Sequence, residues 1–347
     1  MVKYENKKIT AFLLAVMMLT GIFSVGVFAS YADLGEAKAS FQDGVGPETN
    51  GYAIDYVYYS PVEENDSTKY PIVIWLHGMG NGKKPGEQIV PSDIALWATD
   101  EYQSRFKGSE GAYILAARSL EEKNLFWDDC LIHPLRAAID DFIVKNRDNV
   151  DVSRIYIGGY SMGGKMTLKM AVAYPEMFAA IFPICPAWLP GTSATARLAD
   201  IPVWLTSGVT DPLVNYFSMV MTTWNNIIAK SNVKADCRFA SLKNVLYPDG
   251  KLTESGHHSW FAVNYDMFSS GNGDYPSSKL VDGNGNKVKL TYPDGVISWL
   301  SGFTSDFDGT KAADGGNSEA YGSGASSNVF ATVINFFKNL IAYIFGK

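Results

Sequence analysis

The fold is decided by one stretch of sequence, Arg154-Ile155-Tyr156-Ile157-Gly158-Gly159-Tyr160-Ser161-Met162-Gly163-Gly164. It begins as an apolar run and continues, over Met162–Ala173, as a helical pattern that ends at Tyr174-Pro175. Its centre matches G-x-S-x-G, and a strand that turns directly into a helix raises the serine hydroxyl at the carboxyl edge of a sheet. A plain strand-to-helix turn that carries glycines is the alternative. The setting favours a nucleophile at Ser161.

Apolar runs alternate with helical patterns through the middle of the chain. Besides residues 154–158, such runs lie at Pro71–Leu76, Tyr113–Ala117, Ala180–Cys185 and Pro202–Thr206. Strands that are buried on both faces have this near-continuous apolar character, and a helical pattern at Leu135–Val144 lies between two of them. The predicted fold class is therefore α/β, with a mostly parallel central sheet and helices on both faces. Turn residues within Lys279–Tyr292 predict a β-hairpin beside the last helix.

A serine hydroxyl is a poor nucleophile until a base takes its proton, and the chain has four histidines. His77 ends a strand and His133 begins a helical segment, whereas His257 and His258 lie in a Gly-rich loop near the end of the fold. Triads on sheets of this kind follow the chain order serine, acid, histidine, which selects the last pair. Either of the two could be the base, and His257 is preferred because Gly256 before it permits close backbone packing.

The acid of the predicted triad is Asp211, in the turn that follows the apolar run 202–206. An isolated aspartate in such a turn is often only a turn former or a helix cap. Its place in the chain between Ser161 and His257 satisfies the order that a triad requires. We therefore predict that Asp211 orients the histidine.

The loop His77-Gly78-Met79-Gly80 follows the first central strand. In this arrangement the loop supplies one backbone amide of the oxyanion hole, and the residue after the nucleophile supplies the other. We predict Met79 and Met162 as these donors. His77 itself is predicted to have a structural role.

Composition and spacing exclude several other classes of protein. The net charge is −7, from 29 basic and 36 acidic residues, so no nucleic acid is expected as a partner. The three cysteines, Cys130, Cys185 and Cys237, are scattered, so we expect three free thiols and no structural zinc. Residues 78–84 and 282–286 match a phosphate loop and a calcium loop only in part. No cofactor and no metal are therefore expected.

Beyond these patterns, the chain resembles a known family. The likeness is carried by the nucleophile stretch, by Tyr174-Pro175-Glu176-Met177-Phe178-Ala179-Ala180, by Pro183-Ile184-Cys185, and by Gly256-His257 followed by Ser259-Trp260. These segments resemble exported α/β-hydrolases of the prolyl-oligopeptidase-like "predicted peptidase" group, close to feruloyl and acetyl-xylan esterases and polyhydroxybutyrate depolymerases. The resemblance implies an α/β-hydrolase fold, a triad of Ser161, Asp211 and His257, and ester or peptide substrates. The chain lacks the propeller domain of prolyl oligopeptidases, which favours esters.

The first 29 residues predict an export signal. Three lysines precede an apolar stretch, and small residues precede a cleavage point after Ala29. The stretch is long enough that an uncleaved membrane anchor is the alternative. Either would place the remaining chain outside the cytoplasm, as a secreted protein or at the extracellular surface.

The composition divides the remainder into three parts. Residues 30–305 are expected to form the catalytic domain, 306–328 a Gly/Ser-rich linker, and 329–347 an apolar tail helix with one narrow polar stripe. Such a helix either docks on its own domain or lies on a membrane surface or on a second copy of the chain.

The predicted activity is cleavage of carboxylic esters, small-molecule or polysaccharide-linked, with carbohydrate-linked acyl or feruloyl groups as the finer prediction. Trp127, Tyr160 and Trp260 are predicted to bind the substrate, although large aromatic residues more often belong to the core. The alternatives are a secreted serine peptidase, a lipase-like or polyester hydrolase, and a non-catalytic binding module on a hydrolase fold.

Overall fold

The computed structural model of the chain describes residues 34–63, 66–89, 94–247, 250–269, 278–291 and 293–309. They belong to one compact unit within Met1–Lys311. The predicted export signal, nearly all of the predicted linker and the predicted tail helix lie outside the described residues. Among the helices of the described part, none is both long enough and apolar enough to cross a membrane.

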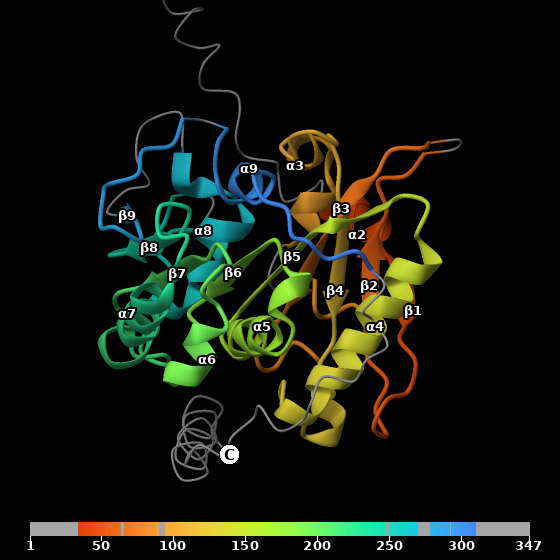
Figure 1. Cartoon of the computed structure of the whole chain (residues 1–347), viewed down its shortest axis with the longest axis horizontal. Helices are drawn as coiled ribbons and strands as arrows, with labels where there is room; N and C mark the ends of the chain where they lie inside the picture. The colour runs from red at the N-terminus through yellow and green to blue at the C-terminus, as the bar shows by residue number, and fades with distance from the viewer. Residues whose placement is uncertain are drawn as a thin grey trace, which may run out of the picture. The chain divides into compact units, whose positions relative to one another are not determined.

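A mixed sheet forms the centre of the unit (Figure 1). Its strands are β1 (Gln42–Val45), β2 (Asp55–Tyr59), β3 (Tyr70–Leu76), β4 (Tyr113–Ala117), β5 (Val150–Tyr160), β6 (Ala180–Ile184), β7 (Trp204–Gly208), β8 (Arg238–Leu242) and β9 (Ser278–Asp282). Their order in the sheet is β1-β2-β4-β3-β5-β6-β7-β8-β9. The strands from β4 to β8 pair in parallel, and antiparallel pairs occur toward the two edges, β1 with β2, β2 with β4, and β8 with β9.

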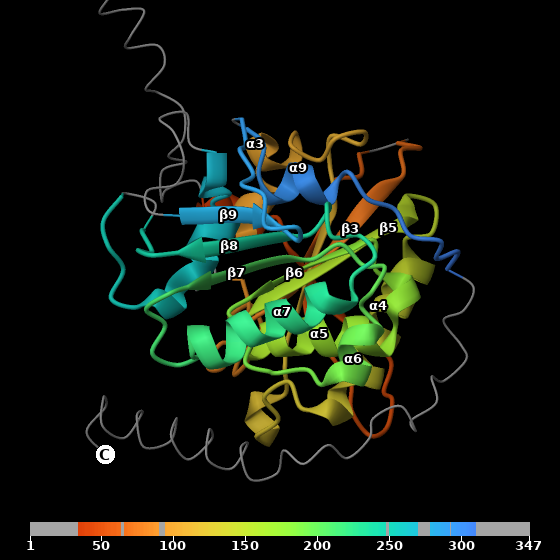
Figure 2. The same cartoon turned by 60° about the vertical axis from the view of Figure 1, so that its left-hand side comes forward.

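Helices cover both faces of this sheet. The α-helices are α2 (Leu34–Ala39), α3 (Asp100–Gln103), α4 (Ile132–Lys145), α5 (Met162–Ala173), α6 (Thr192–Ala196), α7 (Met221–Lys230), α8 (Trp260–Asn264) and α9 (Val296–Leu300). Shorter helical turns are η1 (Ile94–Ala98), η2 (Glu121–Lys123), η3 (Asp129–Leu131), η4 (Pro175–Met177), η5 (Tyr216–Val220), η6 (Gly256–Ser259) and η7 (Met267–Ser269). Figure 2 shows α4, α5 and α7 along one face and α3 and α9 along the other. The predicted α/β layering is confirmed.

The apolar runs of the sequence account for the centre of the sheet. Every residue of β3, β4, β6 and β7 is buried, as expected for strands that are covered on both faces. Strand β4 and helix α5 have the predicted bounds, whereas β7 begins and ends two residues later than predicted. Because the central strands are parallel, their carboxyl ends meet at one edge of the sheet, where ligands of open α/β sheets bind.

The hairpin predicted within residues 279–292 is present, and its first arm also belongs to the central sheet. Strand β9 pairs antiparallel with β8 and extends the sheet by one strand. The return arm pairs with β9 through an antiparallel bridge between Lys287 and Val281. Backbone hydrogen bonds join Asp282 to Asn286 at 2.9 Å and Val288 to Leu280 at 3.0 Å. The carboxylate of Asp282 accepts the backbone N–H of Asn286 at 2.8 Å, which makes this segment a tight turn.

Packing against the domain continues past the boundary predicted between residues 305 and 306. Phe307 is only 4% exposed, and the Arg136 guanidinium lies over its ring, 5.4 Å from the centroid. The Ser305 N–H donates to the Ser153 carbonyl at 2.8 Å. The packed domain therefore continues to at least Phe307.

Candidate active site

Ser161 lies at the sharp turn between β5 and α5. Its backbone angles, φ 57° and ψ −114°, are rare for a residue with a side chain. The surrounding structure holds this conformation, because the Ser161 N–H donates to the Ile184 carbonyl at 3.0 Å and the Ser161 carbonyl accepts the Ala187 N–H at 3.0 Å. This is the strained strand-to-helix turn that the sequence predicts, and it lies at the carboxyl edge of the sheet.

The glycines beside Ser161 are required by close backbone packing. A Cβ atom on Gly159 would lie 2.2 Å from the Leu76 carbonyl oxygen, and one on Gly163 would lie 2.0 Å from the same atom. A backbone carbonyl of a central strand cannot move aside as a flexible side chain can. The glycine spacing of the motif therefore follows from the contact between this turn and the end of β3.

His257 and Asp211 form a buried pair at the same edge. The His257 Nδ1 lies 2.8 Å from the Asp211 Oδ2, and the two side chains are 10% and 0% exposed. The other carboxylate oxygen of Asp211 accepts the backbone N–H groups of Leu213, at 2.8 Å, and Val214, at 2.9 Å. Both carboxylate oxygens are therefore occupied, and the ring of His257 is held in one orientation.

Two glycines allow the histidine loop to reach the acid. A Cβ on Gly208 would lie 2.2 Å from the Gly256 carbonyl oxygen, and one on Gly256 would lie 2.6 Å from the Asp211 nitrogen. The structure thus pairs His257 with the acid. His258 instead lies 3.6 Å from Glu254, whose side chain is 72% exposed.

Cys185 is a neighbour of the histidine that the sequence patterns did not indicate. It follows β6 with a positive φ of 34°, is fully buried, and its Sγ lies 3.7 Å from the His257 carbonyl oxygen. The donor atoms of Cys185, Asp211 and His257 lie within 4.8 Å of one another, a spacing that a metal ion could use. The His257 Nδ1 carries the proton that it donates to Asp211, so it is not available as a ligand in this arrangement.

The electrostatics around His257 make its ring more basic. Burial alone would lower the pKa of His257, but the neighbouring Cys185 and Asp211 outweigh burial and raise the pKa. A carboxylate that accepts the Nδ1 proton favours the charged imidazolium, which is the form that a general base adopts after it takes a proton. The Nε2 atom is left to act as the base.

We call residues 78–82, which follow β3, the oxyanion loop. The His77 Nδ1 donates to the Gly78 carbonyl at 2.6 Å, and the His77 Nε2 accepts the Ser119 N–H at 3.0 Å. Burial lowers the pKa of His77 to about 4, so the ring stays neutral and keeps this tautomer. Since C=O and N–H of a trans peptide point in opposite directions, the Met79 N–H points away from the Gly78 carbonyl and its contact with His77. The predicted structural role of His77 is consistent with these contacts.

Burial argues against one of the three predicted substrate-binding residues, Trp127, and the contacts of Tyr160 place it beside the oxyanion loop. Trp127 is fully buried and its indole N–H donates to the His77 carbonyl at 2.9 Å, so it offers no face to a substrate. Tyr160 is 5% exposed, its ring packs against Gly78, and its hydroxyl accepts the Asn81 Nδ2 at 2.8 Å. Trp127 thus contacts the residue before the oxyanion loop, and Tyr160 contacts Gly78 and Asn81 within it.

The third predicted substrate-binding residue, Trp260, is partly exposed. Its ring lies 4.3 Å from that of Tyr160 and 5.9 Å from that of His257, with an interplanar angle of 86° to the imidazole. The Trp260 ring therefore adjoins both Tyr160, which precedes Ser161, and His257.

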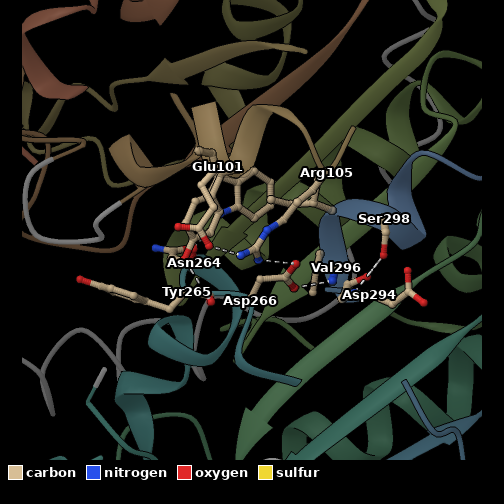
Figure 3. A network of polar contacts seen from close by, with 12 residues as sticks. Glu101, Arg105, Asn264, Tyr265, Asp266, Asp294, Val296 and Ser298 are labelled. Atoms are coloured by element: carbon tan, nitrogen blue, oxygen red, sulfur yellow. Dashed lines mark hydrogen bonds and ion pairs between the residues drawn. The ribbon is translucent and has the colours of Figure 1, made fainter. Parts of the chain in front are cut away.

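The helix that follows His257 is anchored at its far end by a buried polar network (Figure 3). Asp266 lies 3.5 Å from the Arg105 guanidinium and accepts the Val296 N–H at 2.6 Å, and Arg105 also pairs with Glu101 at 2.7 Å. Burial raises the pKa of Asp266 to about 6. This network ties the segment after α8 to α3 and α9, on the far side of the sheet from α5.

Comparisons with known proteins agree with the fold. A model of the phospholipase/carboxylesterase family matches residues 131–245, which include Ser161 and Asp211. No significant match was found among curated protein sequences. A thermostable esterase of known structure is 25% identical, with a TM-score of 0.54, and the match covers 67% of this chain and 62% of that one. This chain thus spans less than two thirds of that esterase.

Two other solved structures are more distant. Esterase 2 of Thermogutta terrifontis, phosphorylated by paraoxon, is 14% identical with a TM-score of 0.47, covering 66% of this chain and 91% of that one. An acylaminoacyl peptidase in complex with Z-Gly-Gly-Phe-chloromethyl ketone is 15% identical with a TM-score of 0.43, covering 66% and 40%. Neither informs the function of this chain at that distance. The chain has the α/β-hydrolase fold, and Ser161 and the pair of His257 and Asp211 lie on loops at the carboxyl edge of its sheet.

Proposed function

We propose that this chain is an exported serine hydrolase that cleaves carboxylic esters through Ser161, His257 and Asp211. The observation that carries the proposal is the buried contact of 2.8 Å between His257 and Asp211, at the sheet edge where the strained turn presents Ser161. The three residues follow β5, β7 and β8, which run parallel, so their loops converge on one edge. The end of β6 links them, because Ile184 accepts the Ser161 N–H and Cys185 contacts the His257 carbonyl.

The first half of the reaction forms an acyl-enzyme. The His257 Nε2 takes the proton of the Ser161 hydroxyl, and Oγ bonds to the carbonyl carbon of the ester. The carbonyl oxygen takes up the negative charge, which the N–H groups of Met79 and Met162 stabilise. When the carbonyl re-forms, the bond to the alcohol oxygen breaks and the alcohol receives the proton from His257.

The second half releases the acid. Water gives a proton to the His257 Nε2 and bonds to the acyl carbon, and the same two amides hold the oxyanion. The bond to Oγ then breaks, and Ser161 regains its proton from the imidazole. Asp211 remains a carboxylate throughout and stabilises the imidazolium in each half.

Esters fit this site better than peptides on chemical grounds, because an alkoxide leaves without the strict protonation that an amine requires. Trp260 supports the finer proposal of an aryl or sugar-linked acyl group, since its partly exposed ring adjoins that of His257. The predicted export signal supports action outside the cytoplasm. The apolar tail would then hold the enzyme near a membrane surface or a second copy of the chain.

The test is turnover by the purified protein on p-nitrophenyl acyl esters, methyl ferulate, acetylated xylan and peptide anilides. We expect ester cleavage that is abolished in Ser161→Ala, with the fold intact by circular dichroism. Ser193→Ala is the matched control, since Ser193 is exposed on α6. A fluorophosphonate probe should label the wild type and the control, and not Ser161→Ala. Ester hydrolysis that persists in Ser161→Ala would overturn the assignment.

A further inference from the structure

The segment that follows β4 holds the oxyanion loop and His77 before it at three points. The Arg118 guanidinium donates to the Gly82 carbonyl, at the end of the loop, at 2.9 Å. Ser119 donates to the ring of His77, which in turn holds the Gly78 carbonyl. Two residues further on, the Oε1 atom of Glu121 accepts the Gly80 N–H at 2.8 Å. The contacts of Ser119 and Glu121 join residues that are 42 and 41 positions apart in the sequence, and they hold the loop on both sides of Met79.

Together the two contacts fix both peptide planes that meet at Met79. The plane before Met79 is fixed through the Gly78 carbonyl, and the plane after it is fixed through the Gly80 N–H. In a trans peptide the Met79 carbonyl points opposite to the Gly80 N–H, and therefore away from Glu121. A rotated plane would aim that carbonyl at the carboxylate, and two negative ends would repel each other. The Glu121 carboxylate thus stabilises the peptide plane after Met79 in the observed orientation and destabilises the rotated one.

Gly80 makes this support necessary. Its φ of +96° lies in the region that only glycine adopts freely, and no atom lies within 4 Å of where its Cβ would be. Because glycine has no side chain, sterics restrict the rotation of the peptide planes on either side of it less than at any other residue. An external acceptor must therefore hold its N–H in place.

Glu121 is buried for this contact, whereas its neighbour is not. Glu121 is 6% exposed, and burial raises its pKa, an effect that the Gly80 and Gly82 amides partly offset. The side chain of Glu122 is 40% exposed and pairs with Arg118 at 3.0 Å. A carboxylate is costly to bury unless it makes specific contacts, and the contacts of Glu121 are with backbone amides of the oxyanion loop, those of Gly80 and Gly82.

We propose that Glu121 is a positioning residue that orients the Met79 N–H toward the developing oxyanion by holding the Gly80 amide. This inference rests on the proposed serine-hydrolase function, since it assigns a role within the same site. Glu121 touches neither the substrate nor the reacting atoms, and acts only through the loop.

The test is the steady-state kinetics of Glu121→Leu on an ester that the wild type cleaves in a Ser161-dependent manner. Leucine has a similar volume and cannot accept a hydrogen bond. Losing one oxyanion donor costs about 10²- to 10³-fold in kcat, so a misaligned donor should cost at least about tenfold, with KM within about threefold. Glu121→Gln keeps an acceptor oxygen and should restore at least about a third of the wild-type kcat. Glu176→Gln, at an exposed carboxylate on η4, is the matched control and should stay within about twofold.

A second readout separates positioning from general damage. The inhibition constant of a boronic acid, whose adduct with Ser161 places an oxygen in the oxyanion hole, should weaken in parallel with kcat/KM. If Glu121→Leu does not fold, Glu121→Asp takes its place. The aspartate carboxylate is one methylene too short to reach the Gly80 N–H, so we expect the same loss in kcat. The inference is overturned if the substituted protein keeps kcat within about threefold, if only KM changes, or if Glu121→Gln loses as much as Glu121→Leu. A wild type that cleaves no ester would instead count against the proposed function.

Discussion

Replacing Asp211 by asparagine should trap His257 in the wrong tautomer. Both oxygens of Asp211 are committed, Oδ2 to the His257 Nδ1 and Oδ1 to the N–H groups of Leu213 and Val214. In Asp211→Asn the amide oxygen must stay on the two backbone donors, so its NH₂ group faces the imidazole. The imidazole then accepts at Nδ1 and carries its proton on Nε2, where the base is needed.

The size of the loss follows from these contacts. Turning the asparagine over to restore the tautomer would leave two backbone donors facing an NH₂ group. A buried donor without an acceptor costs about 1–3 kcal/mol, so the reversal costs about 2–6 kcal/mol. At about 1.4 kcal/mol for each tenfold, this corresponds to a loss of about 30-fold to 10⁴-fold in kcat. We expect the upper end, because the Asp211 side chain is fully buried and no water can take over its role.

The assay is kcat for a p-nitrophenyl ester, measured for the wild type, for Asp211→Asn and for Asp43→Asn. Asp43 is exposed on β1, so the control should retain full activity. Thermal melting should place the two variants within a few degrees of the wild type, since the substitution at Asp211 conserves shape. A kcat for Asp211→Asn within about tenfold of the wild type would refute the argument from the tautomer.

Two further predictions concern pH. Because its neighbours raise the pKa of His257, kcat/KM should rise with pH through a midpoint above 6.5, and Cys185→Ala should move that midpoint to lower pH. Rate profiles of both proteins test this, and a wild-type midpoint at or below 6.5 would contradict it. Burial lowers the pKa of His77 to about 4. Between pH 6.5 and pH 4 the unfolded chain therefore takes up a proton at this residue and the folded protein does not. The free energy of unfolding should be at its full value above pH 6.5 and should fall by about 3 kcal/mol toward pH 4. The check is denaturant unfolding of the wild type and of His77→Gln across this pH range. An unfolding free energy that changes equally with pH in the two proteins would count against the prediction.

The central strands and the nucleophile helix could be predicted because their signals are local. Helix α5 has the predicted bounds, Met162–Ala173, since its pattern begins at a glycine turn and ends before Pro175. Strand β4 also has its predicted bounds. The edge strands β1 and β2 gave no such signal, because their residues are mostly exposed or half-buried and lack a continuous apolar run.

The site was predicted where chain order constrains it and missed where only contact reveals it. The sequence favoured His257 over His258 as the base, and in the structure His257 is the one that contacts Asp211. Trp127 was misjudged because an aromatic residue near a motif fits a core position and a substrate wall equally well in sequence.

The sequence by itself determined the strand, turn and helix around Ser161, because glycine sterics and hydrophobic periodicity act between residues a few positions apart. It also determined the order of serine, acid and histidine along parallel strands. Only the tertiary structure decided that Glu121 holds the oxyanion loop and that Cys185 contacts the histidine loop. These contacts join loops that are distant in the chain. They depend on how side chains pack at the sheet edge, which no local pattern records.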